Sequence, residues 1–146
     1  MQFITSRLVA LGVEVDDAEE AIRIAGNLLC RAGFVESCYV DAMVESYGKN
    51  GPYFVIAPHI AVPHARPQDG SNSPAISLVT LRSPVPFGSE ANDPVNVVFG
   101  LAACSDSGHL ELLQKLVGFL RSPATRDAIA EAASYSDIER LLEGNG

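Results

Sequence analysis

Residues 51–67 read GPYFVIAPHIAVPHARP and hold two of the chain's three histidines, His59 and His64. The residues between the opening glycine and the closing proline are mostly apolar, a pattern typical of a short strand that ends in a turn. His64 stands between Pro63 and Ala65, with Pro67 shortly after it. Because proline fixes the backbone and removes a hydrogen-bond donor, this position holds a side chain on a rigid turn.

The sequence around this segment predicts an α/β domain with a mixed β-sheet covered by helices on both faces. On the N-terminal side we expect a strand over 7–15, a helix from Asp16 and Asp17 to about Arg31, and a second helix from about Ser37 to Tyr47 that ends at Gly48. β-rich runs around Val55, from 75 and from 95 predict further strands.

The last third of the chain changes to a helical period. One helix is expected around HLELLQKLVGFLRS, and two more around SPATRDAIAEAA and YSDIERLLEG, starting at Ser122–Pro123 and Ser136–Asp137. In the first of these helices the following apolar residues are expected on one face: Leu110, Leu113, Leu116, Val117 and Leu120.

Size and charge narrow the classes of protein that the chain can represent. Its 146 residues predict a single compact domain over 1–146. A formal charge of −8 with ten scattered basic residues argues against nucleic-acid binding and against an anionic membrane surface. The N-terminus does not resemble a secretory signal, and no apolar run reaches the roughly 20 residues that span a bilayer. An odd count of three cysteines without C-x-x-C spacing fits a reducing cytosol, so we expect a cytoplasmic protein.

His64 is the first candidate for a chemical role. The unperturbed pKa of histidine, near 6.5, leaves a neutral and nucleophilic nitrogen at cytoplasmic pH. The same pattern is equally compatible with a structural histidine bonded to the nearby backbone.

His109 is the second candidate, because it follows the last predicted strand and opens an amphipathic helix. Helix N-termini attract phosphate, so two histidines at separate strand ends could face one anion. A solvent-facing histidine in the first turn is the alternative.

Metal binding and thiol chemistry find less support in the pattern. His59 and His64 are five residues apart, so on a continuous strand they would point to opposite faces, which disfavours a shared metal. Nucleotide-binding glycine motifs and G-x-S-x-G do not occur. Cys104 lies near His109, but a buried structural cysteine at the end of a strand is the simpler interpretation.

The motif IAVPHARP resembles the phosphohistidine motif of enzyme IIA domains of the mannitol/fructose type, from the bacterial phosphoenolpyruvate:sugar phosphotransferase system (PTS). GPYFVIAP before it, SLVTLRSPVPF after it and NDPVNVVFGLAA are most similar to the ascorbate-type branch. The resemblance extends from about Asp16 to Leu142, and the downstream His109 stands at the corresponding place after the last strand.

This resemblance implies a role for each of the two candidate histidines. His64 would accept a phosphoryl group from the phosphocarrier HPr and donate it to a cysteine of a cognate enzyme IIB, which serves a membrane enzyme IIC permease. His109 would contact the phosphoryl group without carrying it, and no cofactor or metal would be needed. The chain departs from the family pattern at His59, where a small or acidic residue is expected, and it lacks the arginine that precedes the motif in the mannitol-type branch. Arg66 is the nearest basic residue.

Two other functions remain open beside a sugar-transport phosphocarrier. One is a stand-alone regulatory domain that binds a target according to its phosphorylation state, and the other is a metal-dependent or thiol hydrolase. Residues around the motif could form an apolar rim for docking carrier proteins or could equally belong to the core: Phe54, Ile60, Val62 and Phe87.

Overall fold

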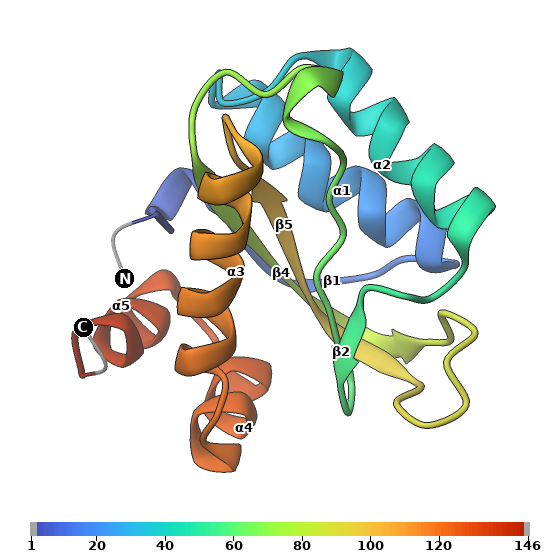
Figure 1. Cartoon of the computed structure of the whole chain (residues 1–146). Helices are drawn as coiled ribbons and strands as arrows, with labels where there is room; N and C mark the ends of the chain where they lie inside the picture. Colours follow the sequence, from blue (N-terminus) through green and yellow to red (C-terminus); the bar gives the residue numbers. More distant parts are fainter. Residues whose placement is uncertain (1–2, 145–146) are drawn as a thin grey trace.

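The computed structural model describes residues 3–144, and within this range five strands form one mixed sheet in the order β1-β4-β5-β3-β2 (Figure 1). The strands are β1 (Val9–Val13), β2 (Val55–Ala57), β3 (Ile60–Ala61), β4 (Ala75–Val85) and β5 (Val95–Ala102). β4 and β5 are antiparallel, whereas β1 runs parallel to β4 and β3 parallel to β5. Helices lie on both faces, which confirms the predicted fold class.

The central strand β5 and the first seven residues of β4 are buried on both sides, so they lack the alternation of a half-exposed strand. Leu78 and Phe99 face one helical layer while Val79 and Val98 face the other. At the edge, the strand predicted over 7–15 is shorter, because Ser6–Leu8 form a 3-10 turn before β1 begins.

One face is covered by α1 (Ala18–Arg31) and α2 (Ser37–Asn50). Asp17 is the N-cap of α1, as predicted, and its side chain accepts a hydrogen bond from the Glu20 N–H. The prediction that α2 ends at Gly48 was wrong. The helix continues through Gly48 to Asn50, and Gly51, with φ of 73°, ends it.

The other face is covered by α3 (Asp106–Phe119), α4 (Pro123–Glu131) and α5 (Tyr135–Gly144). Ser122 caps α4 as predicted, whereas Ser136 lies inside α5. The predicted apolar face of α3 was partly wrong, because Leu110 and Val117 are exposed. The helix is rotated so that it buries Leu112, Leu116 and Phe119, with Leu113 partly buried and Leu120 buried just after its end.

The motif segment is not one continuous strand. β2 and β3 form a tight hairpin around Pro58 and His59, and His59 adopts φ of 71°. The chain then leaves β3 and makes a single parallel bridge between His64 and Leu101, near the end of β5. His59 and His64 are therefore spread along the sheet edge and do not alternate on one strand.

The four residues considered for an apolar rim all belong to the core. Phe54, Ile60, Val62 and Phe87 are each 2% exposed or less. The interpretation of these residues as a docking rim was wrong, and the alternative of a core role is confirmed. In the described part of the chain, no helix is both long enough and apolar enough to cross a bilayer.

Candidate functional site

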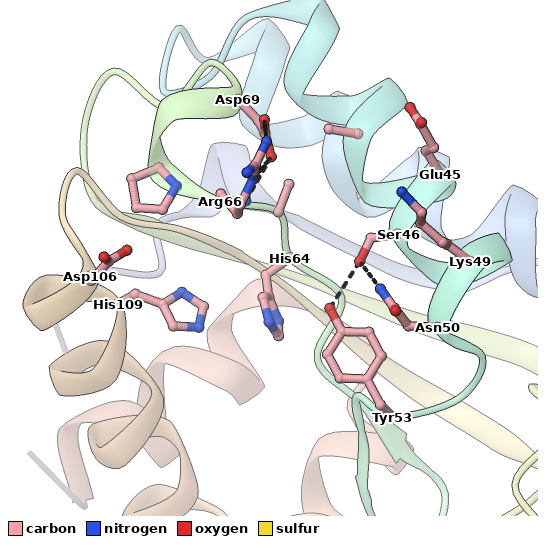
Figure 2. Close-up of a pocket in the computed structure, with 13 residues that line it drawn as sticks. Glu45, Ser46, Lys49, Asn50, Tyr53, His64, Arg66, Asp69, Asp106 and His109 are labelled. Carbon is pink, nitrogen blue, oxygen red and sulfur yellow. Dashed lines mark hydrogen bonds and ion pairs between the residues drawn. The ribbon is translucent and has the colours of Figure 1, made fainter.

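An open cleft of about 940 Å³ lies where α2, the His64 segment and the start of α3 meet (Figure 2). α2 supplies a polar stripe at helical spacing, and the segment after it supplies the motif residues. The cleft is lined by Ala42, Glu45, Ser46, Lys49, Asn50, Tyr53, His64, Ala65, Arg66, Pro67, Asp69, Asp106 and His109. Both histidines chosen from the sequence are thus brought into one cleft.

His64 is held in one ring orientation by its own segment. Its Nδ1 lies 2.9 Å from the Val62 carbonyl oxygen. Because a carbonyl oxygen can only accept, Nδ1 carries the proton, and Nε2 of the neutral ring keeps its lone pair. Among the described residues Nε2 has no hydrogen-bond partner, so it is the nitrogen available as a nucleophile.

His109 lies beside His64, with 4.5 Å between the ring centroids (Figure 2). It stands in the first turn of α3, where the Ser105 side chain caps the helix by accepting the Gly108 N–H. The alternative of a solvent-facing histidine does not fit, because the ring is partly buried against His64. A group bound to His64 Nε2 would thus lie near a second imidazole and the N-terminus of a helix.

Aromatic rings enclose the other side of His64. The Tyr53 ring meets it edge-on at 5.6 Å between centroids, and the buried Phe54 ring does so at 6.2 Å. The Tyr53 hydroxyl bonds Ser46 on α2 at 3.0 Å, which fixes the exposed tyrosine over the cleft (Figure 2). Tyr53 was not among the residues that the sequence suggested.

The cleft also contains two basic side chains in different situations. Arg66 forms an ion pair of 3.1 Å with Asp69, and its backbone N–H bonds the same carboxylate. This pairing lowers the pKa of Asp69. Lys49, from the last turn of α2, has no ion-pair partner among the described residues, and sequence reasoning overlooked it. Its spacing from Ala42 and Glu45 marks a helix face, but nothing in the sequence shows that this face meets the histidines.

The environment keeps both histidines neutral near neutral pH. Burial lowers the pKa of His64, and His109 lowers it further, although the bond to Val62 acts in the opposite direction. Burial also lowers the pKa of His109, while Asp106 acts to raise it. Neutral imidazole is the form that can attack an electrophile.

His59, Arg82 and Cys104 do not line the cleft. His59 bonds the Pro94 carbonyl and lies beside Asn96 and Val97 at the start of β5, whereas His64 lies beside Leu101. Four residues along a strand separate these places by about 13 Å.

The predicted burial of Cys104 was wrong. β5 ends at Ala102, so Cys104 falls in the exposed turn before α3. Within residues 3–144, no three side chains of the types His, Cys, Asp and Glu gather closely enough to hold a metal ion.

Relatives of the chain share both its length and its fold. It is 37% identical over 128 residues to the SgcA protein of Escherichia coli K12, named as a phosphotransferase IIA component, which covers 88% of this chain and 90% of the relative. It is 34% identical over 136 residues to the ascorbate-specific PTS system EIIA component of Salmonella typhimurium, covering 92% and 88%.

Among solved structures, the complex of mannitol enzyme IIA with phosphorylated enzyme IIB from Escherichia coli matches with a TM-score of 0.84 and 28% identity, over 96% of each chain. The family model for the "phosphoenolpyruvate-dependent sugar phosphotransferase system, EIIA 2" matches residues 2–145. The chain therefore belongs to the EIIA 2 family of the phosphoenolpyruvate-dependent sugar phosphotransferase system.

Proposed function

We propose that this chain carries a phosphoryl group on Nε2 of His64, taking it from HPr and passing it to a cysteine of a cognate enzyme IIB. The observation that carries the proposal is the pair of neutral imidazoles in one open cleft, with His64 Nδ1 held by the Val62 carbonyl and Nε2 left as a nucleophile. The membership of the chain in a family of phosphotransferase components supports the same reaction.

The phosphoryl group can be transferred in two steps without a cofactor, with one bond formed and one bond broken at phosphorus in each step. The Nε2 lone pair of His64 attacks phosphorus while the P–N bond to the HPr histidine breaks and its electron pair returns to that ring. His64 then bears a positive charge shared with Nδ1–H, and the Val62 carbonyl dipole stabilises this charge. In the second step a thiolate of enzyme IIB attacks phosphorus, a P–S bond forms, and His64 returns to its neutral state.

The surroundings of His64 meet the demands of phosphoryl transfer, which are mainly positioning and charge stabilisation. His109 and the N-terminal turn of α3 lie next to the place that the phosphoryl oxygens would occupy. Lys49 is the cation of the cleft that no carboxylate neutralises in the described structure, and we assign it to the same task.

The sugar is inferred from relatives and not from the cleft. Several relatives are named ascorbate-specific PTS system EIIA components. We propose ascorbate or a related sugar as the substrate of the enzyme IIC permease that this chain would serve. The sugar itself would never contact the cleft.

Labelling the purified chain with phosphoenolpyruvate, enzyme I and HPr tests the proposal. We expect one phosphoryl group, labile in acid and in hydroxylamine as a P–N bond is, and none on His64→Ala. His59→Ala is the matched control and should be labelled normally, because His59 lies at the opposite end of β5. Label retained on His64→Ala would refute the assignment. Subsequent loss of label to an ascorbate-type enzyme IIB separates a transport component from a purely regulatory domain.

A further inference from the structure

Tyr39 of α2 is a fully buried tyrosine whose hydroxyl contacts the backbone of two segments, the one that carries His64 and strand β5. The hydroxyl lies 2.6 Å from the Leu101 carbonyl oxygen and 3.2 Å from that of Ala65. With one proton to donate, it bonds Leu101 at the shorter distance. It also accepts a hydrogen bond of 3.1 Å from the Ala65 N–H.

Leu101 is therefore the common anchor of both neighbours of His64. Its N–H donates to the Pro63 carbonyl at 3.1 Å, and its carbonyl receives the Tyr39 hydroxyl, which in turn holds Ala65. The first link attaches the residue before His64 to β5, and the second attaches the residue after it. Two restrained neighbours fix the backbone of His64 and hence the direction of its side chain.

The ring of Tyr39 could be replaced by that of phenylalanine without changing the apolar contacts. A hydroxyl in the core is unfavourable unless it is bonded, so what distinguishes tyrosine here is the pair of hydrogen bonds. Burial raises the pKa of Tyr39 to about 12, so the hydroxyl remains a donor throughout the neutral range.

We propose that Tyr39 is a positioning residue: through Ala65 and Leu101, its hydroxyl holds His64 so that Nε2 is aligned for phosphoryl transfer. This rests on the proposed function of His64. Tyr39 itself does not line the cleft, and it acts through the backbone.

Tyr39→Phe, compared with Tyr47→Phe, tests this role. Tyr47 belongs to the same helix, and its hydroxyl donates to the Phe87 carbonyl at 2.7 Å, so both variants lose a tyrosine–carbonyl bond. Only the first variant releases Ala65 and Leu101. We expect the rate of phosphoryl transfer at saturating HPr to fall by about ten- to a hundredfold in Tyr39→Phe, because a small misplacement of reacting atoms has an effect of this size. The KM for HPr and the rate of Tyr47→Phe should remain near those of the native chain.

A second measurement on the unphosphorylated protein separates this proposal from the proposed function. ¹⁵N NMR of the His64 ring reports its tautomer and its pKa without any partner protein. In Tyr39→Phe we expect a mixture of tautomers and a pKa that moves up towards the ordinary value as the ring becomes more hydrated, with no change in Tyr47→Phe. If native His64 accepts no phosphoryl group, the proposed function fails, but these ring signals still test Tyr39.

Equal transfer rates and equal His64 ring signals in the two variants would overturn the proposal. Should Tyr39→Phe not fold, 3-fluorotyrosine in place of Tyr39 keeps the ring and the hydroxyl but makes the oxygen a poorer acceptor for Ala65. The same replacement of Tyr47 is the control. Slower transfer for position 39 alone would support the positioning role, and identical rates for the two positions would refute it.

Discussion

The two imidazoles of the cleft differ in the task that their surroundings permit. His64 has Nδ1 fixed by a backbone carbonyl, which leaves one defined nucleophile. His109 has no such bond among the described residues, and it lies in the first turn of a helix, beside the place that a phosphoryl group would occupy. The geometry thus supports the proposed roles of His64 as carrier and His109 as stabilising neighbour, although both are the same residue type.

Replacing His109 with alanine should slow transfer without removing the acceptor. The loss of one preorganised charge-stabilising group slows a reaction by roughly ten- to a thousandfold. Rapid-quench measurement of phosphorylation by HPr gives the rate, and circular dichroism checks the fold. Gln114→Ala, an exposed change on the same helix, is the control. A His109→Ala rate equal to that of the control would exclude His109 from the reaction.

The lowered pKa values of His64 and His109 predict how stability depends on pH. In the unfolded chain both histidines have the ordinary pKa near 6.5, whereas burial depresses the pKa of each in the folded state. The unfolded state therefore binds more protons below that pH, and stability is lost as pH falls from about 6.5 through the lowered values. Above this window the histidines contribute no slope.

Urea unfolding between pH 8 and pH 5 measures this slope before most carboxylates begin to titrate. The double substitution of His64 and His109 by glutamine should flatten it. A native chain that became more stable between pH 6.5 and pH 5 would contradict the depressed pKa values.

At the scale of elements, the sequence predicted the type of most helices and strands but not what they face. The cap at Asp17 and the apolar runs of β4 and β5 are local signals, so they were found. The rotation of α3 could not be predicted, because several apolar stripes fit the same leucine-rich sequence. Packing on the sheet decides which of these stripes is buried. For the same reason Phe54 and Val62 could be interpreted as either rim or core.

The site shows the same division between local and tertiary information. His64 and His109 could be named because of a motif and a position after a strand. Lys49 and Tyr39 could not, since both lie on α2 and approach the His64 segment only through the packing of that helix. Tyr53 lies in the motif segment itself, but its place over the cleft depends on its contacts with Ser46 and His64. A polar stripe on a helix is also what an ordinary solvent-exposed face looks like.

The unexpected length of α2 leads to a prediction about Gly48, the glycine inside its last turns, and Gly51, the glycine that follows it. Gly48 is exposed in the helix, and a Cβ there would meet nothing within 4 Å, so Gly48→Ala should stabilise the protein by about 0.5–1 kcal/mol. Gly51 has φ of 73° and ψ of −151°, a region that is nearly exclusive to glycine. Gly51→Ala should therefore destabilise by about 1–3 kcal/mol.

Urea denaturation of both variants decides the point, because the two substitutions add the same methyl group at sites three residues apart. Opposite signs of the change in unfolding free energy would confirm that α2 ends at Asn50. Destabilisation by Gly48→Ala would instead place the end of the helix at Gly48, as the sequence had suggested.

At the scale of the whole molecule, the chain is strongly negative, whereas the charges that line the cleft nearly cancel. The formal charge is −8, but Lys49 and Arg66 offset most of the charge of the three carboxylates that line the cleft, Glu45, Asp69 and Asp106. The basic residue Arg82 lies on β4 outside the cleft and does not contribute to this balance. A local balance of this kind reduces the repulsion of an acidic partner at the site itself.

We propose that exposed apolar side chains next to the histidines form the surface that carrier proteins contact briefly. Tyr53 is 49% exposed in the cleft, and Leu110, which follows His109, is 55% exposed. These residues replace the rim that the sequence suggested. Large apolar residues exposed beside a reactive group are typical of interaction sites.

Leu110→Asp should therefore weaken phosphoryl exchange far more than Val117→Asp. Both residues are exposed on α3 and both substitutions add one negative charge, but Val117 lies two turns further along, about 10 Å from Leu110. We expect at least a tenfold lower kcat/KM for HPr in the first variant and nearly native exchange in the second, with unchanged circular dichroism in both.

If apolar contact dominates docking, raising the salt concentration should change the native rate only modestly. Equal losses in the two variants, or an order-of-magnitude loss between low and physiological salt, would mean that the field of the whole protein governs the encounter. In that case the charges distributed over the surface, and not Leu110, would determine which carrier proteins dock at His64.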